Sequence, residues 1–365
     1  MAPKVIGIVT CNYSSKDAES FTADRPIAAT PFAGRYRVVD FAMSNLVNYG
    51  IRTVGMIMPH NYRSLIDHVG AGKDWDLDRK NGGLFVMPGS AFGTARRGSR
   101  FLLRDLIENK VVLTRNTHGY VVLTSANFVY NYDLAKLVDE HLANGADITV
   151  LTQTAPAAND DVVAFEVKDG EVKGMKLGVE AGETAFIDCF IIKRSLLLDM
   201  LDWYAAEDHL DLFEAIFANT NPVCIKTLDF DGYCAPVFDK AAFYGASMDL
   251  RNPAIAAQLF LPDRFIKTKS HDTSPAKFEV GSRVVGSLVS SGSRIYGEVE
   301  GSVLSRNVIV EAGAKVTNSI IMQGTVIKSG AVIDYAIVDR NNVIPAGTVL
   351  KGTAEDVLVK GKARG

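Results

Sequence analysis

The sequence has little of what marks a secreted or membrane-spanning protein. Its four cysteines are far apart and form no Cys-x-x-Cys pair: Cys11, Cys189, Cys224 and Cys234. Widely spaced cysteines without such a pair are typical of reduced thiols in a protein of a reducing compartment. The apolar run at residues 5–9 is shorter than the roughly 7–15 residues of a secretory signal, and nothing reaches the roughly 20 of a membrane span. We therefore expect a soluble, cytoplasmic protein that does not bind membranes.

The sequence also lacks an excess of charge of either sign. Its formal net charge is -3, which gives no general attraction to nucleic acids or anionic membranes, although a local basic patch stays open. Hydrophobic residues make up 47% and charged residues 22%, a composition that excludes an intrinsically disordered chain. At roughly 150 residues per domain, the length predicts two domains, or one large and one small.

The first 255 residues alternate short apolar runs with helical patterns. Strands are expected at residues 5–10, 52–58, 120–124 and 147–153, and helices at 40–48, 100–109 and 132–143. This alternation predicts an α/β fold with a parallel sheet. Because ligands bind at the carboxyl ends of strands in such sheets, we expect any chemistry in the loops after Thr10, Met58 and Thr124.

Phenylalanine and tryptophan are missing near the C-terminus, where neither follows Phe278. Apolar residues recur six apart there, as in Val310 and Val316. A period of six fits neither a helix nor a plain strand, and it predicts a hexapeptide β-helix of triangular coils. A sandwich of short strands is the alternative. The expected division is an α/β domain at 1–255, a connector at 256–279 and a β-helix at 280–365.

Three stretches carry motifs, and the first two are long enough to be specific: residues 31–45 (PFAGRYRVVDFAMSN), 72–79 (GKDWDLDR) and 93–95 (GTA). They resemble, in this order, the F-G-G-x-Y-R-I-I-D-F-x-L-S-N, G-x-x-W-D-L-D-R and G-T-A stretches of bacterial ADP-glucose pyrophosphorylases, also called glucose-1-phosphate adenylyltransferases. The resemblance implies a Rossmann-like, GT-A-like nucleotidyltransferase domain with a mixed sheet, followed by a left-handed parallel β-helix. It also places Gly93 and Thr94 in the nucleotide pocket.

The loop after the first strand departs from this family. In the family, glucose 1-phosphate attacks the α-phosphate of ATP, a reaction that requires Mg²⁺ held by carboxylates. A G-G-x-G-x-R-L run lets backbone N–H groups approach the triphosphate, whereas residues 8–33 of this chain contain no glycine. With bulky Tyr13 and acidic Asp17 and Glu19 in this loop, we do not expect it to bind a triphosphate.

Both carboxylates that hold the metal in this family are replaced. Asn127 occupies the position of the aspartate in the A-G-D-H-I-Y segment, and Pro236 that of the aspartate in Y-W-R-D-V-G-T. An amide is a much weaker Mg²⁺ ligand than a carboxylate, and proline has no side-chain oxygen. Asp133 is better explained as a first-turn helix residue, and Asp239 lies three positions from the required place. We expect no intact catalytic residue and no metal site.

The segments that contact the sugar phosphate are also altered. Lys176 is the nearest cation to the family's E-K-P lysine, and the lysine of its R-A-K-P segment becomes Ile27. Arg96 and Arg97 follow the G-T-A stretch, where the family has small or apolar residues. Whether this pair binds an anion or fills the old nucleotide pocket with charge stays open.

This pattern is similar to the regulatory, non-catalytic type of subunit that accompanies a catalytic partner in Firmicutes. The resemblance implies a hetero-oligomer, expected to be a heterotetramer, with a catalytic ADP-glucose pyrophosphorylase subunit that serves glycogen synthesis. The catalytic partner would need the Mg²⁺, and this chain needs no cofactor of its own. The alternatives are an active sugar-1-phosphate nucleotidyltransferase with substituted metal ligands, or a purely structural assembly subunit. An acyltransferase is disfavoured because no histidine follows His271.

Three arginines are candidates for binding an anionic effector. Relatives bind phosphate or fructose 1,6-bisphosphate at a basic pocket formed partly by this stretch and partly by the β-helix domain. This chain has Arg25, Arg35 and Arg37 in the stretch, and Arg25 and Arg37 match family positions. The family's lysine before the first arginine and its histidine before the Phe are replaced by Asp24 and Pro31, which weakens the pocket. Ordinary solvated arginines are the alternative.

Overall fold

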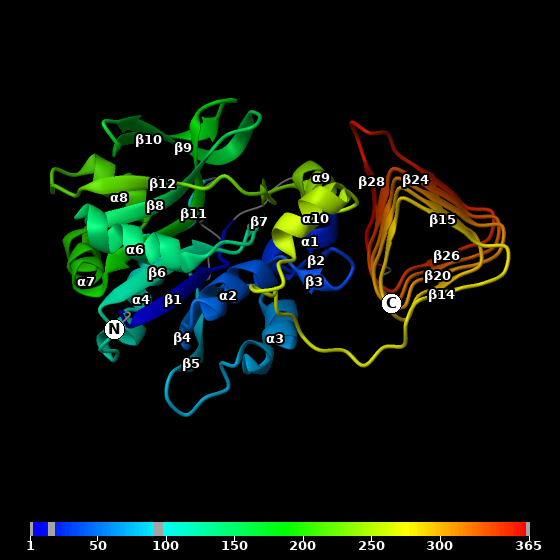
Figure 1. The fold of residues 1–365 in the computed structure, drawn as a ribbon, viewed down its shortest axis with the longest axis horizontal. Coiled ribbons are helices and arrows are strands. Elements are labelled where there is room, and N and C mark those ends of the chain that lie inside the picture. Colours follow the sequence, from blue (N-terminus) through cyan, green and yellow to red (C-terminus); the bar gives the residue numbers. More distant parts are fainter. Residues whose placement is uncertain (1–2, 14–18, 91–97, 363–365) are drawn as a thin grey trace. The chain divides into compact units, whose positions relative to one another are not determined.

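The computed structural model describes residues 3–13, 19–90 and 98–362, which form two compact units (Figure 1). The sheet unit comprises residues 1–15, 39–236 and 261–267. The β-helix unit comprises residues 16–38, 237–260 and 268–365. This division differs from the three consecutive segments expected from the sequence, because two segments from the first 260 residues belong with the C-terminal coil.

The sheet unit is built on a nine-stranded mixed sheet of order β5-β4-β1-β6-β11-β8-β12-β10-β9. Its strands are β1 (Val5–Thr10), β4 (Thr53–Met58), β5 (Gly83–Pro88), β6 (Tyr120–Ser125), β8 (Ile148–Thr154), β9 (Asn159–Lys168), β10 (Glu171–Val179), β11 (Thr184–Lys193) and β12 (Ile225–Asp229). The neighbours β5, β4, β1 and β6 run parallel, whereas β11 is antiparallel to both β6 and β8. The strands expected from the apolar runs are present, and the mixed α/β architecture is confirmed.

The helices of the sheet unit are α2 (Val39–Asn48), α3 (Arg63–Val69), α4 (Leu103–Glu108), α5 (Val111–Thr114), α6 (Leu134–Asn144), α7 (Arg194–Trp203) and α8 (Leu212–Ala218). α6 is followed by Gly145, whose φ of 67° is in the left-handed region that glycine adopts without strain. Phenylalanine rings fill the core, and the ring centres of Phe101 and Phe190 are 4.9 Å apart. In the described part of the chain, no helix combines the length and apolar character needed to cross a membrane.

The β-helix unit contains a parallel coil of three five-stranded sheets. The first sheet is β14 (Lys277–Phe278), β17 (Arg294–Ile295), β20 (Ile309–Val310), β23 (Val326–Ile327) and β26 (Val343–Ile344). The second is β15 (Arg283–Val285), β18 (Glu298–Glu300), β21 (Lys315–Thr317), β24 (Val332–Asp334) and β27 (Val349–Lys351). The third is β16 (Leu288–Val289), β19 (Val303–Leu304), β22 (Ile320–Ile321), β25 (Ala336–Val338) and β28 (Leu358–Lys360). Figure 1 shows the triangular outline of these coils.

The coil explains the six-residue period in the sequence. Val310 ends a strand of the first sheet, and Val316 lies in the following strand of the second sheet, so a step of six moves from one side of the triangle to the next. Inward residues stack in register, as in the buried ladder of Val310, Ile327 and Ile344. The predicted parallel β-helix is therefore confirmed, and its first strand begins at Lys277, inside the segment expected to be a connector.

The third sheet of the coil is covered on its outer side as well. Val303 and Ile320, one above the other in the ladder, are buried even though their neighbours in each strand fill the inside. The same unit contains α1 (Glu19–Thr22), β2 (Pro31–Phe32), β3 (Tyr36–Arg37), α9 (Lys240–Asp249) and α10 (Pro253–Leu259). Tyr244 of α9 donates its hydroxyl to the carbonyl of Asn318 at 2.6 Å. The change of composition along the sequence could not show that these segments, which precede the coil in the chain, belong with it in one unit.

Candidate functional site

The carboxyl ends of β1 and β6 lie side by side in the sheet unit, because Thr10 pairs with Ser125. The start of the loop that follows β1 is fixed by hydrogen bonds. Asn12 is buried and donates its amide to Asp105 Oδ2 at 2.7 Å, while the backbone N–H of Ser90 donates to Asp105 Oδ1 at 2.6 Å. The first residues of the loop are thus fixed by side-chain contacts, as the absence of glycine suggests.

The two predicted degenerate positions are brought together in the structure. Asn127 is fully buried between β6 and β7 (Phe128–Tyr130). Pro236 ends β13 (Cys234–Pro236) and pairs with Phe128, the residue after Asn127. Asn127 and Pro236 therefore lie at neighbouring positions, and neither supplies a carboxylate.

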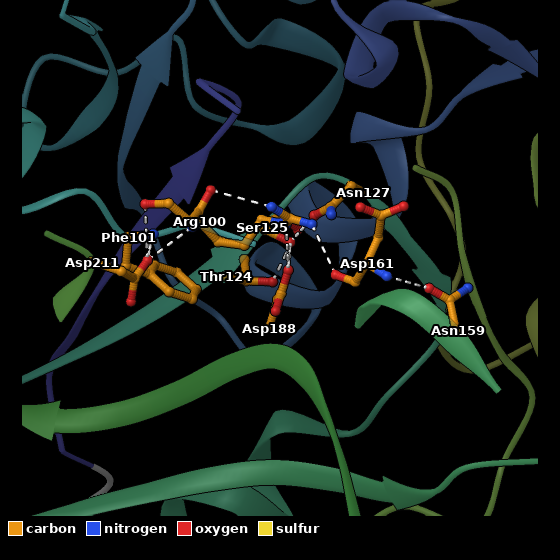
Figure 2. A network of polar contacts seen from close by, with 10 residues as sticks. Arg100, Phe101, Thr124, Ser125, Asn127, Asn159, Asp161, Asp188 and Asp211 are labelled. Carbon is orange, nitrogen blue, oxygen red and sulfur yellow. Dashed lines mark hydrogen bonds and ion pairs between the residues drawn. The ribbon is translucent and has the colours of Figure 1, made fainter. Parts of the chain in front are cut away.

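A buried ion pair lies beside Asn127 (Figure 2). Ser125 Oγ contacts Asn127 Oδ1 and also donates to Asp188 Oδ2 at 2.9 Å. Arg100 Nε lies 3.4 Å from the same Asp188 oxygen, and both side chains are less than 5% exposed. Arg100 also donates to the carbonyl oxygen of Asp161 at 3.2 Å, and its guanidinium lies 5.5 Å from the ring centre of Tyr13. Ser125 and Asp188 therefore connect Asn127 to a buried cation of the protein itself, Arg100.

Burial governs the electrostatics of this pair. It raises the pKa of Asp188 to about 6, although Arg100 and the hydrogen bond from Ser125 oppose the shift. Burial also raises the pKa of Asp211, which accepts backbone N–H groups of Arg100 and Phe101 at 2.8 and 2.7 Å. Asp211 thereby fixes the backbone from which the Arg100 side chain extends.

Sequence reasoning missed Arg100 and Asp188. Asp188 interrupts an otherwise apolar strand, β11, and adopts a φ of 51° at an irregularity in the pairing of β11 with β8. A lone carboxylate within an apolar strand is a signal that could have been noticed. A non-glycine residue in this conformation is unusual and points to a role for its side chain.

The two aspartates considered as replacement ligands have other partners. Asp133 accepts the backbone N–H of Ala135 at the start of α6, and Asp239 accepts that of Ala242 at the start of α9. Both are helix N-caps, which accounts for their positions. Within residues 3–13, 19–90 and 98–362, no group of three His, Cys, Asp or Glu side chains could hold a metal ion. The donor set does not fit Mg²⁺.

The remaining positions from the sugar-phosphate and nucleotide segments are less informative. Lys176 is paired with Glu183 at 2.6 Å on the exposed side of β10, and Ile27 is buried. The predicted nucleotide-pocket residues Gly93 and Thr94, together with Arg96 and Arg97, lie outside the described residues.

The structure separates the three arginines proposed to bind an effector. Arg25 is fully buried in the β-helix unit and forms an ion pair with Asp339 at 2.7 Å, so its charge is already compensated. Arg37 donates to the carbonyl of Ala29 at 3.1 Å. Arg35 is exposed, and its guanidinium lies 5.3 Å from the ring centre of Tyr36.

Arg35 lines a pocket of about 480 Å³ within the β-helix unit. The basic side chains on its wall also include Lys269, His271 and Arg306, which sequence reasoning did not single out. They lie far from Arg35 in the sequence, so only the fold could bring them together. Ser290 and Ser291 supply hydroxyl groups at the same wall.

Two of the long motifs meet in a buried contact. His68 Nε2 lies 2.6 Å from Asp40 Oδ1, and its ring packs edge-on against Trp75. Asp40 belongs to the 31–45 stretch and Trp75 to the 72–79 stretch, and all three side chains are buried. These parts of the motifs therefore hold the fold together.

Comparison with known proteins agrees with this architecture. Residues 20–173 match the nucleotidyl transferase family, and residues 274–356 match the GlmU-like C-terminal hexapeptide family. The chain is 32% identical to the glycogen biosynthesis protein GlgD of Bacillus subtilis (strain 168), over 86% of this chain and 82% of that protein. It is likewise 32% identical to the GlgD of Geobacillus stearothermophilus, over 87% and 84%. The glucose-1-phosphate adenylyltransferase of Thermotoga neapolitana is 30% identical over 79% of this chain and 70% of that enzyme.

Proposed function

This chain belongs to the family that contains the glucose-1-phosphate adenylyltransferases and the glycogen biosynthesis protein GlgD, and on that premise we propose that it is a regulatory subunit with little or no catalytic activity of its own. It modulates a catalytic paralogue in a cytoplasmic hetero-oligomer, most simply a heterotetramer, that makes ADP-glucose for glycogen. The Mg²⁺ needed for the reaction is bound by that paralogue.

The observation that supports this proposal is the Arg100–Asp188 ion pair beside Asn127. Nucleotidyl transfer needs a divalent cation held by carboxylates to neutralise charge that develops on the phosphates. Here Asn127 offers an amide, Pro236 offers no side-chain oxygen, and Asp188 is engaged by Arg100 and Ser125. Each lost metal carboxylate costs several kcal/mol of transition-state stabilisation, and about 1.4 kcal/mol is already tenfold in rate.

The direct test measures Mg²⁺-dependent formation of ADP-glucose from ATP and glucose 1-phosphate by the purified chain. We expect turnover near background. The double variant Asn127→Asp/Pro236→Asp should not restore a normal rate, because the loop after β1 and the Arg100–Asp188 pair are unchanged. Turnover by the unaltered chain in the range of its active relatives would favour the alternative of an active nucleotidyltransferase with substituted ligands.

A mixing experiment tests the regulatory role. The chain is combined with the catalytic paralogue, and the assembly is examined by size exclusion with light scattering and by the same assay. Raised activity or a shifted response to effectors supports regulation, with a coupling of about 1–3 kcal/mol, or roughly 5–150-fold. Co-elution without kinetic change supports a purely structural subunit. Absence of association at micromolar concentration rejects the hetero-oligomer.

We assign the effector role to the pocket around Arg35 rather than to all three predicted arginines. Phosphate or fructose 1,6-bisphosphate fits a wall that presents Arg35, Lys269 and Arg306. In the mixed assembly, Arg35→Gln should weaken the response to fructose 1,6-bisphosphate several-fold. Lys351→Gln, which removes one exposed cation elsewhere in the β-helix unit, should not. Equal responses of the two variants would assign the effector to another site.

A further inference from the structure

A second pocket lies at the opposite end of the parallel strands, away from the site described above. It has a volume of about 660 Å³ and lies within the sheet unit. Lys4 immediately precedes β1, Arg52 precedes β4 and Gly82 precedes β5. Because neighbouring parallel strands start at one edge of the sheet, the residues before them converge there. This placement makes the pocket independent of the nucleotide region.

The wall of this pocket is cationic. Lys4, Arg52 and Lys80 line it, and none of the described residues on its wall is an aspartate or a glutamate. Arg52 Nη1 donates to the carbonyls of Val47 and Ile51 at 2.7 and 2.9 Å, which fixes its guanidinium at the wall. Cations gathered around one concavity repel one another, and a bound anion would relieve that repulsion.

A buried polar atom on the same wall has no protein partner. His118 lines the pocket, and its Nδ1 atom is shielded from solvent without a hydrogen bond to any described residue. Arg194 Nε donates to the His118 carbonyl at 2.8 Å, so the residue is held in place. Buried polar atoms are rarely left unpaired, and this one would gain a partner only if the His118 ring turned toward a group bound in the pocket.

We propose that this pocket binds a small phosphorylated metabolite, such as a sugar phosphate or a mononucleotide. Its volume is typical of small-molecule sites, which span roughly 300–1,000 Å³, and is too small for a nucleic acid or a folded partner. The cations match the two negative charges of a phosphate monoester. Asn81 also lines the pocket, and its amide is of a kind that can bind sugar hydroxyls. The site neither requires nor excludes the regulatory role proposed above.

Calorimetric titration of the full-length chain with inorganic phosphate, glucose 1-phosphate and AMP tests this proposal. We expect at least one phosphorylated probe to bind, and Lys4→Gln/Lys80→Gln to weaken that binding about tenfold. Both lysines are exposed, so the variant should remain folded. The charge-matched control Lys136→Gln/Lys168→Gln, which removes exposed lysines elsewhere in the sheet unit, should bind as the unaltered chain does.

Two further measurements distinguish this site from the others. Arg35→Gln should leave the binding unchanged, since Arg35 lines a different pocket. Titration of His118 by NMR should show that its pKa rises when the probe binds, because a phosphate favours the protonated ring. The proposal is overturned if none of the three probes binds at millimolar concentration, or if the Lys4→Gln/Lys80→Gln variant binds as tightly as the control.

Discussion

At the scale of single residues, Arg100 is the side chain at the degenerate site from which we draw a prediction for stability. Its guanidinium is buried against Asp188, and Asp188 itself is held with a positive φ. Removing one member of a buried ion pair leaves the other charge uncompensated, whereas removing both does not.

We predict that Arg100→Met lowers the free energy of unfolding by about 3–5 kcal/mol. Arg100→Met/Asp188→Gly should cost clearly less, because no buried charge remains and glycine suits the backbone conformation of position 188. Urea unfolding of the unaltered chain, both single variants and the double variant forms a complete cycle. Additive losses in that cycle would show that the two side chains are not coupled.

The raised pKa of Asp188 gives a prediction for pH. The folded protein holds this proton up to about pH 6, whereas an unfolded aspartate releases it near pH 4. Between these values the folded state binds more protons, so the contribution of Asp188 to stability falls as pH rises through this window, by up to about 3 kcal/mol. The stability difference between the unaltered chain and Asp188→Asn should shift in favour of the variant from pH 4 to pH 6. A difference independent of pH would contradict the assignment.

At the scale of elements, the corners of the β-helix depend on paired residues in successive coils. Gly324 has a φ of 70°, and a methyl group added there would overlap Asn341 Oδ1. Gly292 and Asn307 repeat the arrangement, as do Gly301 and Asn318. In each pair, the glycine of one coil makes room for the asparagine of the next.

We expect Gly324→Ala to destabilise the β-helix unit by about 1–3 kcal/mol, through the strained backbone and the overlap with Asn341. Adding Asn341→Gly should recover part of the loss by removing the overlap. Gly347→Ala, also in the β-helix unit, is the control for the overlap, because Gly347 has a φ of 68° and an added methyl group there would meet nothing within 4 Å. Thermal unfolding compares the variants, and an unchanged midpoint for Gly324→Ala would show that the corner adapts.

Local sequence patterns predicted the strands and helices but not the contacts between residues far apart in the sequence. Apolar runs and the six-residue period depend on neighbours in sequence, so they predicted β1, β4, β6 and the coil correctly. Asn127 and Pro236 could be placed because whole motifs surround them. The Arg100–Asp188 pair and the burial of Arg25 against Asp339 join residues far apart in the chain, and no local signal encodes such a pairing.

At the scale of the whole molecule, the proposed function implies that the catalytic partner, and not this chain, binds the Mg²⁺. The described residues of this chain hold no cluster of metal-ligating side chains. A ligand stabilises a protein only if it binds the folded state.

We therefore predict that millimolar Mg²⁺ or EDTA leaves the thermal unfolding midpoint of the isolated chain unchanged. The variant Asn127→Asp, measured in parallel, shows whether one restored carboxylate is enough to create a response. A midpoint of the unaltered chain that rises with Mg²⁺ would mean that a metal site exists, and it would weaken the case for a non-catalytic subunit.

The ion pair between Arg25 and Asp339 also has a consequence for biosynthesis. The two residues are 339 − 25 = 314 positions apart, yet both are buried within one unit. On a ribosome that adds about 5–20 residues per second, Asp339 is synthesised roughly 15–60 seconds after Arg25. During that interval residues 19–38 emerge before the coil that belongs to the same unit. Until translation is nearly complete, Arg25 in the nascent chain therefore has no Asp339 with which to form its buried ion pair.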